Sequence, residues 1–388
     1  MSFKGDSMRR SVAIGILIAV IVAIVVGIRI YLSTSKQQGE ELATKTTVTT
    51  VAMQQSRVVV RGAGATFPLL QIERWIKEFR KSHSSIVITY QGVGSGAGQA
   101  QFFEKTVDFC GSDPPLSRDK WLEYKGKVLQ VPYLLGAVVV VYNLPEAKGK
   151  TLNLSGEVLA LIYRGDIVYW DDPRIARLNP GMHLPHKKIR VVYRADASGT
   201  QQIFTLYLHK AAPNVWPREW VSKTMKSPIV KSGRALGGKG NPGVAQILES
   251  TPYSIGFVEW SYAIKEKLPI AAIENARGEF VKPSIESLMK AASAAAKHLP
   301  KDPTEDFSRD LDFIVYANGS KAYPLTSWTH FVLWKSYEPS KARAIATFLK
   351  WIYSEGYEHI VPGYAPPPPE IKQLLLKAAE IIEEPSSR

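Results

Sequence analysis

The sequence predicts an α/β body preceded by a single membrane-spanning helix. Three observations carry this prediction: an apolar run near the N-terminus, short apolar strands that alternate with amphipathic helices after residue 57, and glycine-bearing turns after several of those strands. The chain has 388 residues, of which 45% are hydrophobic and 22% are charged, as is ordinary for a globular protein. At about 100–200 residues per domain, this length predicts two or three structural units.

The apolar run covers residues 11–28 and follows the basic residues Arg9 and Arg10; after Arg29, residues 30–32 extend the predicted span by another turn, to residues 11–32. Eighteen helical residues span roughly 27 Å, close to the hydrocarbon thickness of a bilayer. The preceding positive charge places the N-terminus in the cytoplasm and the rest of the chain outside. The run is longer than the core of a secretory signal, and no clean Ala-x-Ala cleavage site follows it. We therefore expect an uncleaved anchor in the cell membrane, with a cleaved signal and a secreted protein as the alternative.

Residues 33–56 are rich in Ser and Thr and lack apolar periodicity, which predicts a flexible stalk. Residues 1–56 are thus expected to be an anchor or signal followed by a stalk. The whole chain carries a formal charge of +14, which predicts an anionic partner, but an external location argues against nucleic acid. The single cysteine, Cys110, excludes an internal disulfide and a zinc site built from several cysteines.

Short apolar segments followed by helical stripes predict a mostly parallel sheet, in which ligands bind beyond the carboxyl ends of the strands. The expected strands are 58–60, 86–90, 107–110, 134–142 and 189–193. The expected helices are 69–79, 101–105, 156–163, one through 203–207, 285–298, 341–351 and 371–382. Residues 232–243 are predicted to be a glycine-rich loop. They nearly spell a nucleotide-binding P-loop, but Gly240 stands where its final Ser or Thr is required.

Three strand-to-helix turns have the composition of an anion site. They are 62–67, 94–98 and 198–200, each rich in Gly, Ser or Thr. Such a turn presents free backbone N–H groups at the positive end of a helix dipole. Any one of them alone is more often a plain structural turn or helix cap, but several in one α/β body favour a shared small anion.

Two charged residues sharpen this hypothesis. Arg194 directly follows a strand and can offer a bidentate pair of N–H groups to a tetrahedral oxyanion, with Asp196 orienting the guanidinium. Asp113 would repel an anion unless the ligand brings a proton to donate, which phosphate does near neutral pH and sulfate does not. The alternative for Asp113 is a helix N-cap, a common role in a Ser-Asp-Pro sequence.

Motifs for catalysis are incomplete. The His183 and His186 pair forms no HExxH zinc motif, and Val93 replaces the first glycine of a nucleophile elbow. No convincing pair of nucleophile and base assembles from the pattern. The residues therefore favour binding over enzymatic activity, with no cofactor and no metal.

The turns and their order resemble the substrate-binding proteins of phosphate ABC transporters, the periplasmic phosphate-binding protein family. The matching segments are GAGATFP (62–68), YQGVGSGAG (90–98), TVDFCGSDPPL (106–116), VYWDDPRIARLNPGMHLP (168–185), YRADASGT (193–200), KGNPGV (239–244) and YSIGFVEWSYA (253–263). The resemblance implies a two-lobed, type II periplasmic-binding-protein-like fold with a hinge. Residues 57–134 and 254–388 would form lobe I, and residues 135–253 would form the inserted lobe II.

The resemblance also implies that phosphate is held in a dry cleft between the lobes and delivered to an ABC importer. The implied phosphate-binding residues are Thr66, Phe67, Ser95, Asp113, Arg194, Ser198, Gly199 and Thr200, with Asp196 holding the arginine from behind. The expected partners are inorganic phosphate, the permease subunits and the membrane, with the protein itself a monomer. Another oxyanion such as sulfate or molybdate remains an alternative ligand, and a secreted phosphohydrolase is the alternative from another class.

Overall fold

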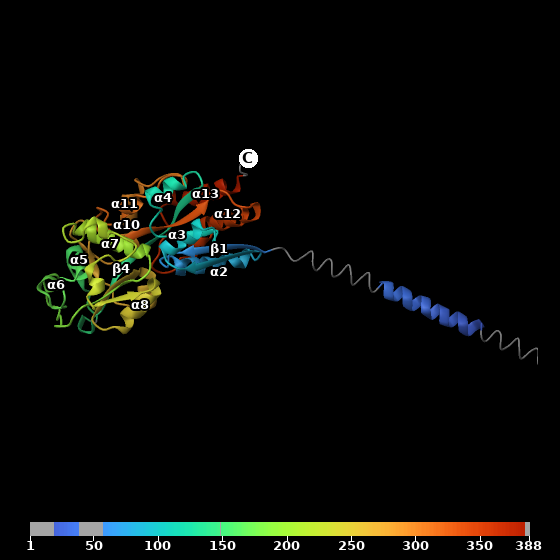
Figure 1. The fold of residues 1–388 in the computed structure, drawn as a ribbon, viewed down its shortest axis with the longest axis horizontal. Helices are drawn as coiled ribbons and strands as arrows, with labels where there is room; N and C mark the ends of the chain where they lie inside the picture. Colours follow the sequence, from blue (N-terminus) through green and yellow to red (C-terminus); the bar gives the residue numbers. More distant parts are fainter. Residues whose placement is uncertain (1–18, 39–56, 148, 385–388) are drawn as a thin grey trace, which may run out of the picture. The chain divides into compact units, whose positions relative to one another are not determined.

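The computed structural model describes residues 19–38, 57–147 and 149–384. The chain divides into two compact units, Met1–Arg57 and Val58–Arg388 (Figure 1). The described part of the first unit is a helix, Ala19–Gln38, whose mean hydropathy of 1.7 and length of 20 residues suit a membrane span. A signal sequence has the same properties. Residues 11–18 of the predicted anchor lie outside the described residues.

The prediction of a flexible stalk over residues 33–56 is wrong for residues 33–38, because the helix continues to Gln38. Ser33 Oγ donates to the Ile30 carbonyl at 2.9 Å, so a polar side chain bonds back onto the helix. Such back-bonding is compatible with a helical turn and is not visible in hydropathy. Residues 39–56 of the predicted stalk lie outside the described residues.

Within its described residues, the second unit contains a large sheet of eight strands and a small one of three. The strands are β1 Val58–Gly64, β2 Ile86–Gly92, β3 Phe109–Ser112, β4 Val128–Asn143, β5 Asn153–Leu154, β6 Arg190–Arg194, β7 Ala235–Gly238, β8 Ser254–Glu259, β9 Ala272–Glu274, β10 Phe280–Val281 and β11 Thr326–Trp334. The large sheet has the order β2-β1-β3-β11-β4-β8-β6-β7, and the small one β10-β9-β5. The α/β class is confirmed.

The large sheet is mixed rather than mostly parallel. Strand β1 pairs in parallel with β2 and β3, and β6 pairs in parallel with β7 and β8. Between these parallel groups lie β11 and β4, which run antiparallel to each other and to their neighbours β3 and β8. Strand β4 is the longest, and all of it except its last residue is buried. Because β4 is buried on both faces, its sequence shows no alternation of apolar and polar residues, and such alternation would have indicated an antiparallel strand.

Helices cover the sheet, and α12 packs on α13, α2 and β1, whereas α8 packs on β6, β7 and β8. Figure 1 labels most of them on the ribbon. The helices are α2 Leu69–Ser82, α3 Ser95–Phe103, α4 Arg118–Glu123, α5 Gly156–Arg164, α6 Pro173–Leu178, α7 Gly199–Ala211, α8 Gly240–Ser250, α9 Trp260–Lys265, α10 Ile285–Ala296, α11 Asp310–Ile314, α12 Pro339–Ser354 and α13 Pro369–Glu383. The 3-10 turns are η1 Pro145–Ala147, η2 Arg218–Trp220, η3 Pro228–Lys231 and η4 Gly356–His359.

Two local predictions need correction. Helix α3 begins at Ser95 rather than near residue 101, because its glycine-rich first turn is helical although such turns have low helix propensity. Residues 232–243, predicted to be a loop, contain strand β7 and the start of helix α8. Gly238 makes this possible, since a Cβ there would lie 2.6 Å from the Val244 nitrogen. Small residues thus allow β7 and α8 to approach each other closely, although the same residues in the sequence are typical of a loop.

Candidate functional site

The turns that the sequence singled out converge where the parallel strands end. Strands β1, β2 and β3 pair in register, so their carboxyl ends meet at one edge, and β6 and β7 end together in the other half of the sheet. All side chains of the predicted cage except the glycine lie at 3% exposure or less. They are Thr66, Phe67, Ser95, Asp113, Arg194, Ser198 and Thr200. The structure therefore gathers the predicted residues into one buried region.

Asp113 follows β3 and is surrounded by donors. Its Oδ1 accepts a hydrogen bond from Thr329 Oγ1 at 3.1 Å, and its Oδ2 accepts one from Ser95 Oγ at 3.4 Å. Its carbonyl accepts from His330 Nδ1 at 3.2 Å. The alternative role as a helix cap is wrong, because the next helix, α4, begins at Arg118 and is capped by the Ser117 side chain.

Burial raises the pKa of Asp113 from its ordinary value to about 7. The hydrogen bond from Thr329 and the positive charge of Arg194 act in the opposite direction, because both favour the carboxylate. The Asp113 carboxyl group is thus balanced between its neutral and ionised forms near neutral pH. A group in this state can accept a proton from a ligand or give one to it.

Helix α7 begins directly against this carboxyl group. A Cβ on Gly199 would lie 2.5 Å from Asp113 Oδ2, so no larger residue fits at this position without a shift. Ser198 caps the helix, and its Oγ accepts from the Gln201 N–H at 3.2 Å. The first N–H groups of this 13-residue helix therefore lie close to Asp113, at the positive end of the helix dipole.

Arg194 lies at the end of β6 and is 2% exposed. Its Nε and Nη2 donate to the two carboxylate oxygens of Asp196 at 2.8 and 2.6 Å, and its Nη1 donates to Thr200 Oγ1 at 3.3 Å. Burial raises the pKa of Asp196, but the hydrogen bond and charge of Arg194 outweigh it and leave that pKa below its ordinary value. Asp196 therefore occupies one edge of the guanidinium, while Nη1 and Nη2 each retain a second N–H.

The segment before helix α2 is fixed by tyrosines from distant elements. Tyr262 Oη donates to the Thr66 carbonyl at 2.9 Å, and Tyr364 Oη donates to the Phe67 carbonyl. Both carbonyls are thereby turned into the protein. The peptide N–H groups at the start of α2 and the Thr66 side chain form the remaining polar groups of this turn.

Three residues of this region were missed by the sequence analysis. Thr329 and His330 come from β11, and Asn241 comes from the first turn of α8. Asn241 is fully buried and donates to Thr66 Oγ1 from both its backbone N–H, at 3.0 Å, and its Nδ2, at 3.1 Å. The motif KGNPGV contained the only signal for Asn241, and nothing local distinguished Thr329.

The arrangement has the chemistry of an anion cage with one proton acceptor. Arg194 supplies charge, the starts of α2, α3 and α7 supply N–H groups, and hydroxyl groups supply further donors. Within the described residues, no cluster of three His, Cys, Asp or Glu side chains forms a metal site.

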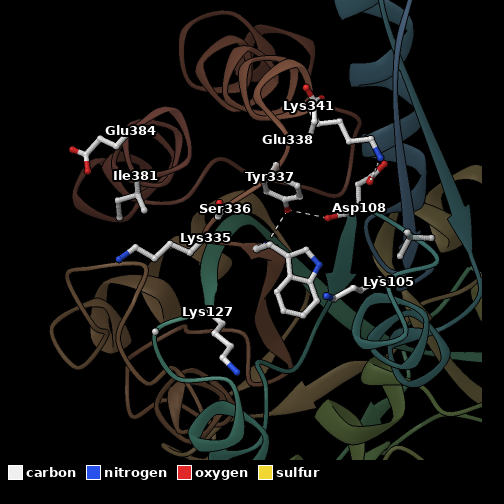
Figure 2. A pocket seen from close by; sticks show the side chains of 13 residues that line it. Lys105, Asp108, Lys127, Lys335, Ser336, Tyr337, Glu338, Lys341, Ile381 and Glu384 are labelled. Carbon is white, nitrogen blue, oxygen red and sulfur yellow. Dashed lines mark hydrogen bonds and ion pairs between the residues drawn. The ribbon is translucent and has the colours of Figure 1, made fainter. Parts of the chain in front are cut away.

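A cavity of about 720 Å³ lies elsewhere, at the opposite ends of the strands (Figure 2). Its lysines do not converge: Figure 2 shows Lys127 and Lys335 pointing in different directions. Lys341 Nζ is paired with Asp108 Oδ1 at 2.5 Å, and the other oxygen, Asp108 Oδ2, accepts from the Arg61 N–H. Volume alone does not make this cavity the anion site, because its charges are spread or already neutralised.

Comparison with known sequences gives one consistent family. Residues 40–356 match a family model described as a PBP superfamily domain. The chain is 44% identical to the phosphate-binding protein PstS of Methanocaldococcus jannaschii over 341 residues, which is 85% of this chain and 87% of that protein. It is 37% identical to the phosphate-binding protein PstS of Pasteurella multocida, over 84% of this chain and 90% of that protein.

Solved structures show the same fold. A phosphate-binding protein from Stenotrophomonas maltophilia superposes with a TM-score of 0.59 at 19% identity, covering 82% of this chain and 93% of that chain. A putative phosphate ABC transporter substrate-binding protein from Clostridium perfringens, solved with bound phosphate, gives a TM-score of 0.55 at 15% identity. That match covers 78% of this chain and 96% of the other chain.

Proposed function

The chain belongs to the phosphate-binding proteins of the PBP superfamily, and from this membership we propose that it captures inorganic phosphate outside the cytoplasm and delivers it to an ABC importer. The observation that carries the choice of ligand is Asp113, a buried carboxyl group placed among donors. A carboxylate in an anion cage needs a ligand oxygen that bears a hydrogen. Hydrogen phosphate has one near neutral pH, and sulfate has none.

In the proposed cage, Thr66 and Phe67 donate through backbone N–H groups, and the Thr66 hydroxyl assists. Ser95 donates through its hydroxyl and amide, and Asp113 accepts the ligand proton. Arg194, held by Asp196, and the first residues of α7 complete the set; these are Ser198, Gly199 and Thr200. This assignment is supported by the burial of all these side chains and by the short distances that join the two groups of turns.

We propose that the cage closes between two lobes, lobe I at 57–134 and 254–388 and lobe II at 135–253. The sheet supports a crossing within β4, because β4 pairs with β11 up to Ala137 and with β8 from Val138 onward. Strand β8 also pairs with β6, so in the sheet it lies beside the strands of lobe II, and the sheet gives no support for the boundary at residue 254. Asp113 and Gly199 would then come from different lobes. Phosphate that contacts both would favour the closed state by its differential affinity.

We propose that the protein delivers phosphate to permease subunits, and its similarity to relatives named as phosphate-binding proteins supports this. We propose that the protein acts as a monomer tethered by residues 11–32. The exposed apolar helix Ala19–Gln38 supports an anchor. A variant that begins at residue 57 should be soluble, monomeric and fully able to bind phosphate; aggregation or lost binding would show that the removed segment belongs to the fold.

The ligand that the purified protein releases on gentle denaturation tests the proposed function directly. Inorganic phosphate is expected, and sulfate or molybdate in its place would overturn the choice of ligand. Incubation with a phosphomonoester distinguishes a phosphohydrolase, because turnover that persists after repeated purification would contradict a binding protein.

A further inference from the structure

We propose that Asn241 is a positioning residue that forces the hydroxyl groups of Thr66 and Thr200 to donate toward the bound anion. The inference rests on the proposed function and adds a residue that acts through the two threonines. A hydroxyl group can donate or accept, so a cage built from hydroxyls discriminates poorly unless their direction is fixed. The contacts of Asn241 fix that direction.

The orientation of Asn241 is itself set by the backbone. Its Oδ1 accepts a hydrogen bond from the Glu259 N–H at 3.0 Å, at the end of β8. A backbone N–H can only donate, so the oxygen end of the amide must face Glu259 and the Nδ2 end must face the threonines. The side chain is fully buried, and no exchange with solvent competes for these groups.

Thr66 Oγ1 has no acceptor capacity left. It accepts from the Asn241 N–H at 3.0 Å and from Asn241 Nδ2 at 3.1 Å. A hydroxyl oxygen has two lone pairs, and two donors from the same residue use both. The remaining function of this hydroxyl group is to donate its hydrogen.

Thr200 Oγ1 is in the same state. It accepts from the second hydrogen of Asn241 Nδ2 at 3.3 Å and from Arg194 Nη1 at 3.3 Å. The two hydrogens of the Asn241 side-chain amide therefore each occupy one lone pair, one on Thr66 Oγ1 and one on Thr200 Oγ1. These two hydroxyl oxygens belong to different proposed lobes. Because Thr66 would belong to lobe I and Asn241 to lobe II, the Thr66 hydroxyl gains its direction only when the lobes are closed.

The two oriented hydroxyl groups favour a ligand oxygen that accepts a hydrogen bond. They disfavour a ligand oxygen that carries a hydrogen beside Thr66 or Thr200. This leaves Asp113 as the acceptor for the single proton of hydrogen phosphate. The hydrogen of the ligand would then be accepted by Asp113 alone and not by any of the hydroxyl groups. Once the lobes have closed, donors whose direction is fixed in this way need no further reorientation around the anion.

The test measures phosphate affinity of the full-length protein and of variants. Asn241→Asp keeps the acceptor that faces Glu259 but replaces Nδ2 with an oxygen, so both hydroxyls should turn toward it and affinity should fall by 100-fold or more. Asn241→Ala should lower affinity by about tenfold, which corresponds to roughly 1.4 kcal/mol. Asn275→Asp is the matched control, since Asn275 is also buried but contacts Glu279 and Ala322, and its phosphate affinity should stay within twofold of wild type.

A double-mutant cycle separates positioning from a general structural effect. In a Thr66→Val background, no hydroxyl remains at position 66 for Asn241 to orient. There, Asn241→Ala should lower phosphate affinity by less than about threefold. The inference is overturned if Asn241→Ala costs the same factor in both backgrounds, or if Asn241→Asp binds phosphate like wild type. If the Asp variant does not fold, the alanine cycle still decides. Wild-type protein that binds no phosphate would instead refute the proposed function.

Discussion

Thr329 Oγ1 lies 3.1 Å from Asp113 Oδ1, although the two residues are 216 positions apart in the chain. The contact exists because β11 runs antiparallel to β3, with His330 opposite Ser112. Strand β11 thereby supplies a donor to the one acidic group of the proposed cage. A hydrogen bond to the charged form of an acid lowers its pKa, so Thr329 keeps Asp113 more ionised than burial alone would.

Thr329→Val should therefore raise the pKa of Asp113 further. At pH 7 more of the carboxyl group would be protonated and unable to accept the ligand hydrogen, so phosphate affinity should fall by roughly tenfold, as for a lost hydrogen bond to a charged group. The loss should shrink at pH 9, where the carboxylate forms in both proteins. Titration calorimetry at both pH values checks this, with Thr329→Ser as a control that keeps the hydroxyl. An equal loss at both values would contradict the role of Thr329.

The turns of the cage could be predicted from the sequence because the residues that form each turn are consecutive in the chain. Each turn rich in Gly, Ser and Thr is by itself typical of a plain turn or helix cap, but several of them in one α/β body favour an anion site, and residues 62–67 and 198–200 lie in such turns. Arg194 and Asp196 are two residues apart, so their pairing also needs no knowledge of the fold.

The rest of the region could not be predicted, because long-range pairing creates it. Strand β11 is buried along nearly its whole length and shows no period-two pattern, so nothing marked Thr329 or its register with β3. Asn241 follows a stretch of small residues whose strand-and-helix conformation depends on close packing rather than on propensity. The assignment of individual ligand contacts and of the lobe boundaries stays a prediction.

Glu259 should make the ligand-free protein less stable as pH rises. Burial raises its pKa from the ordinary value of 4.5 to about 8, so the folded state holds a proton that the unfolded state has already lost between these values. Stability that depends on this proton is fully present below pH 4.5 and is lost as pH rises through about 8. Asp113, with its pKa raised to about 7, acts with the same sign.

Glu259→Gln should make the stability of the ligand-free protein less dependent on pH. Between pH 5 and pH 8.5, the melting temperature of the ligand-free wild type should fall more steeply than that of the variant, by roughly 5 °C. Differential scanning calorimetry measures the difference. Glu249→Gln, on the exposed surface of α8, is the control and should follow the wild-type curve. Parallel slopes in all three proteins would show that Glu259 is ionised when buried.

Arg194→Ala should weaken phosphate binding more than any single hydroxyl change. It removes the charge-assisted donors and leaves Asp196 unpaired beside an anion, so a loss of about 3–5 kcal/mol is expected. Ser95→Ala removes one neutral donor and should cost about 1 kcal/mol. Binding of labelled phosphate by both variants gives the comparison. A larger loss for Ser95→Ala would make the assignment of the arginine wrong.

Asp113→Asn changes which anions the cage accepts. The carboxylate of the wild-type protein faces a ligand oxygen that must carry a hydrogen, since two acceptors would otherwise meet with no hydrogen between them. Such a contact costs at least as much as an unsatisfied buried group, about 1–3 kcal/mol, and more for charges. A fully deprotonated oxyanion is therefore rejected by its lack of a proton rather than by its size. The variant offers an amide donor at the same place and should still bind phosphate.

Sulfate competition against labelled phosphate measures this change. At about pH 9, where Asp113 of the wild type is ionised, sulfate should compete with phosphate for the Asp113→Asn variant and only weakly for wild type. In wild type the competition should strengthen as pH falls below about 7, because the protonated Asp113 then has a hydrogen to donate to sulfate. In the variant no proton enters at this position, so its competition by sulfate should depend less on pH. Equal competition in both proteins across this range would remove the physical basis for assigning phosphate through Asp113.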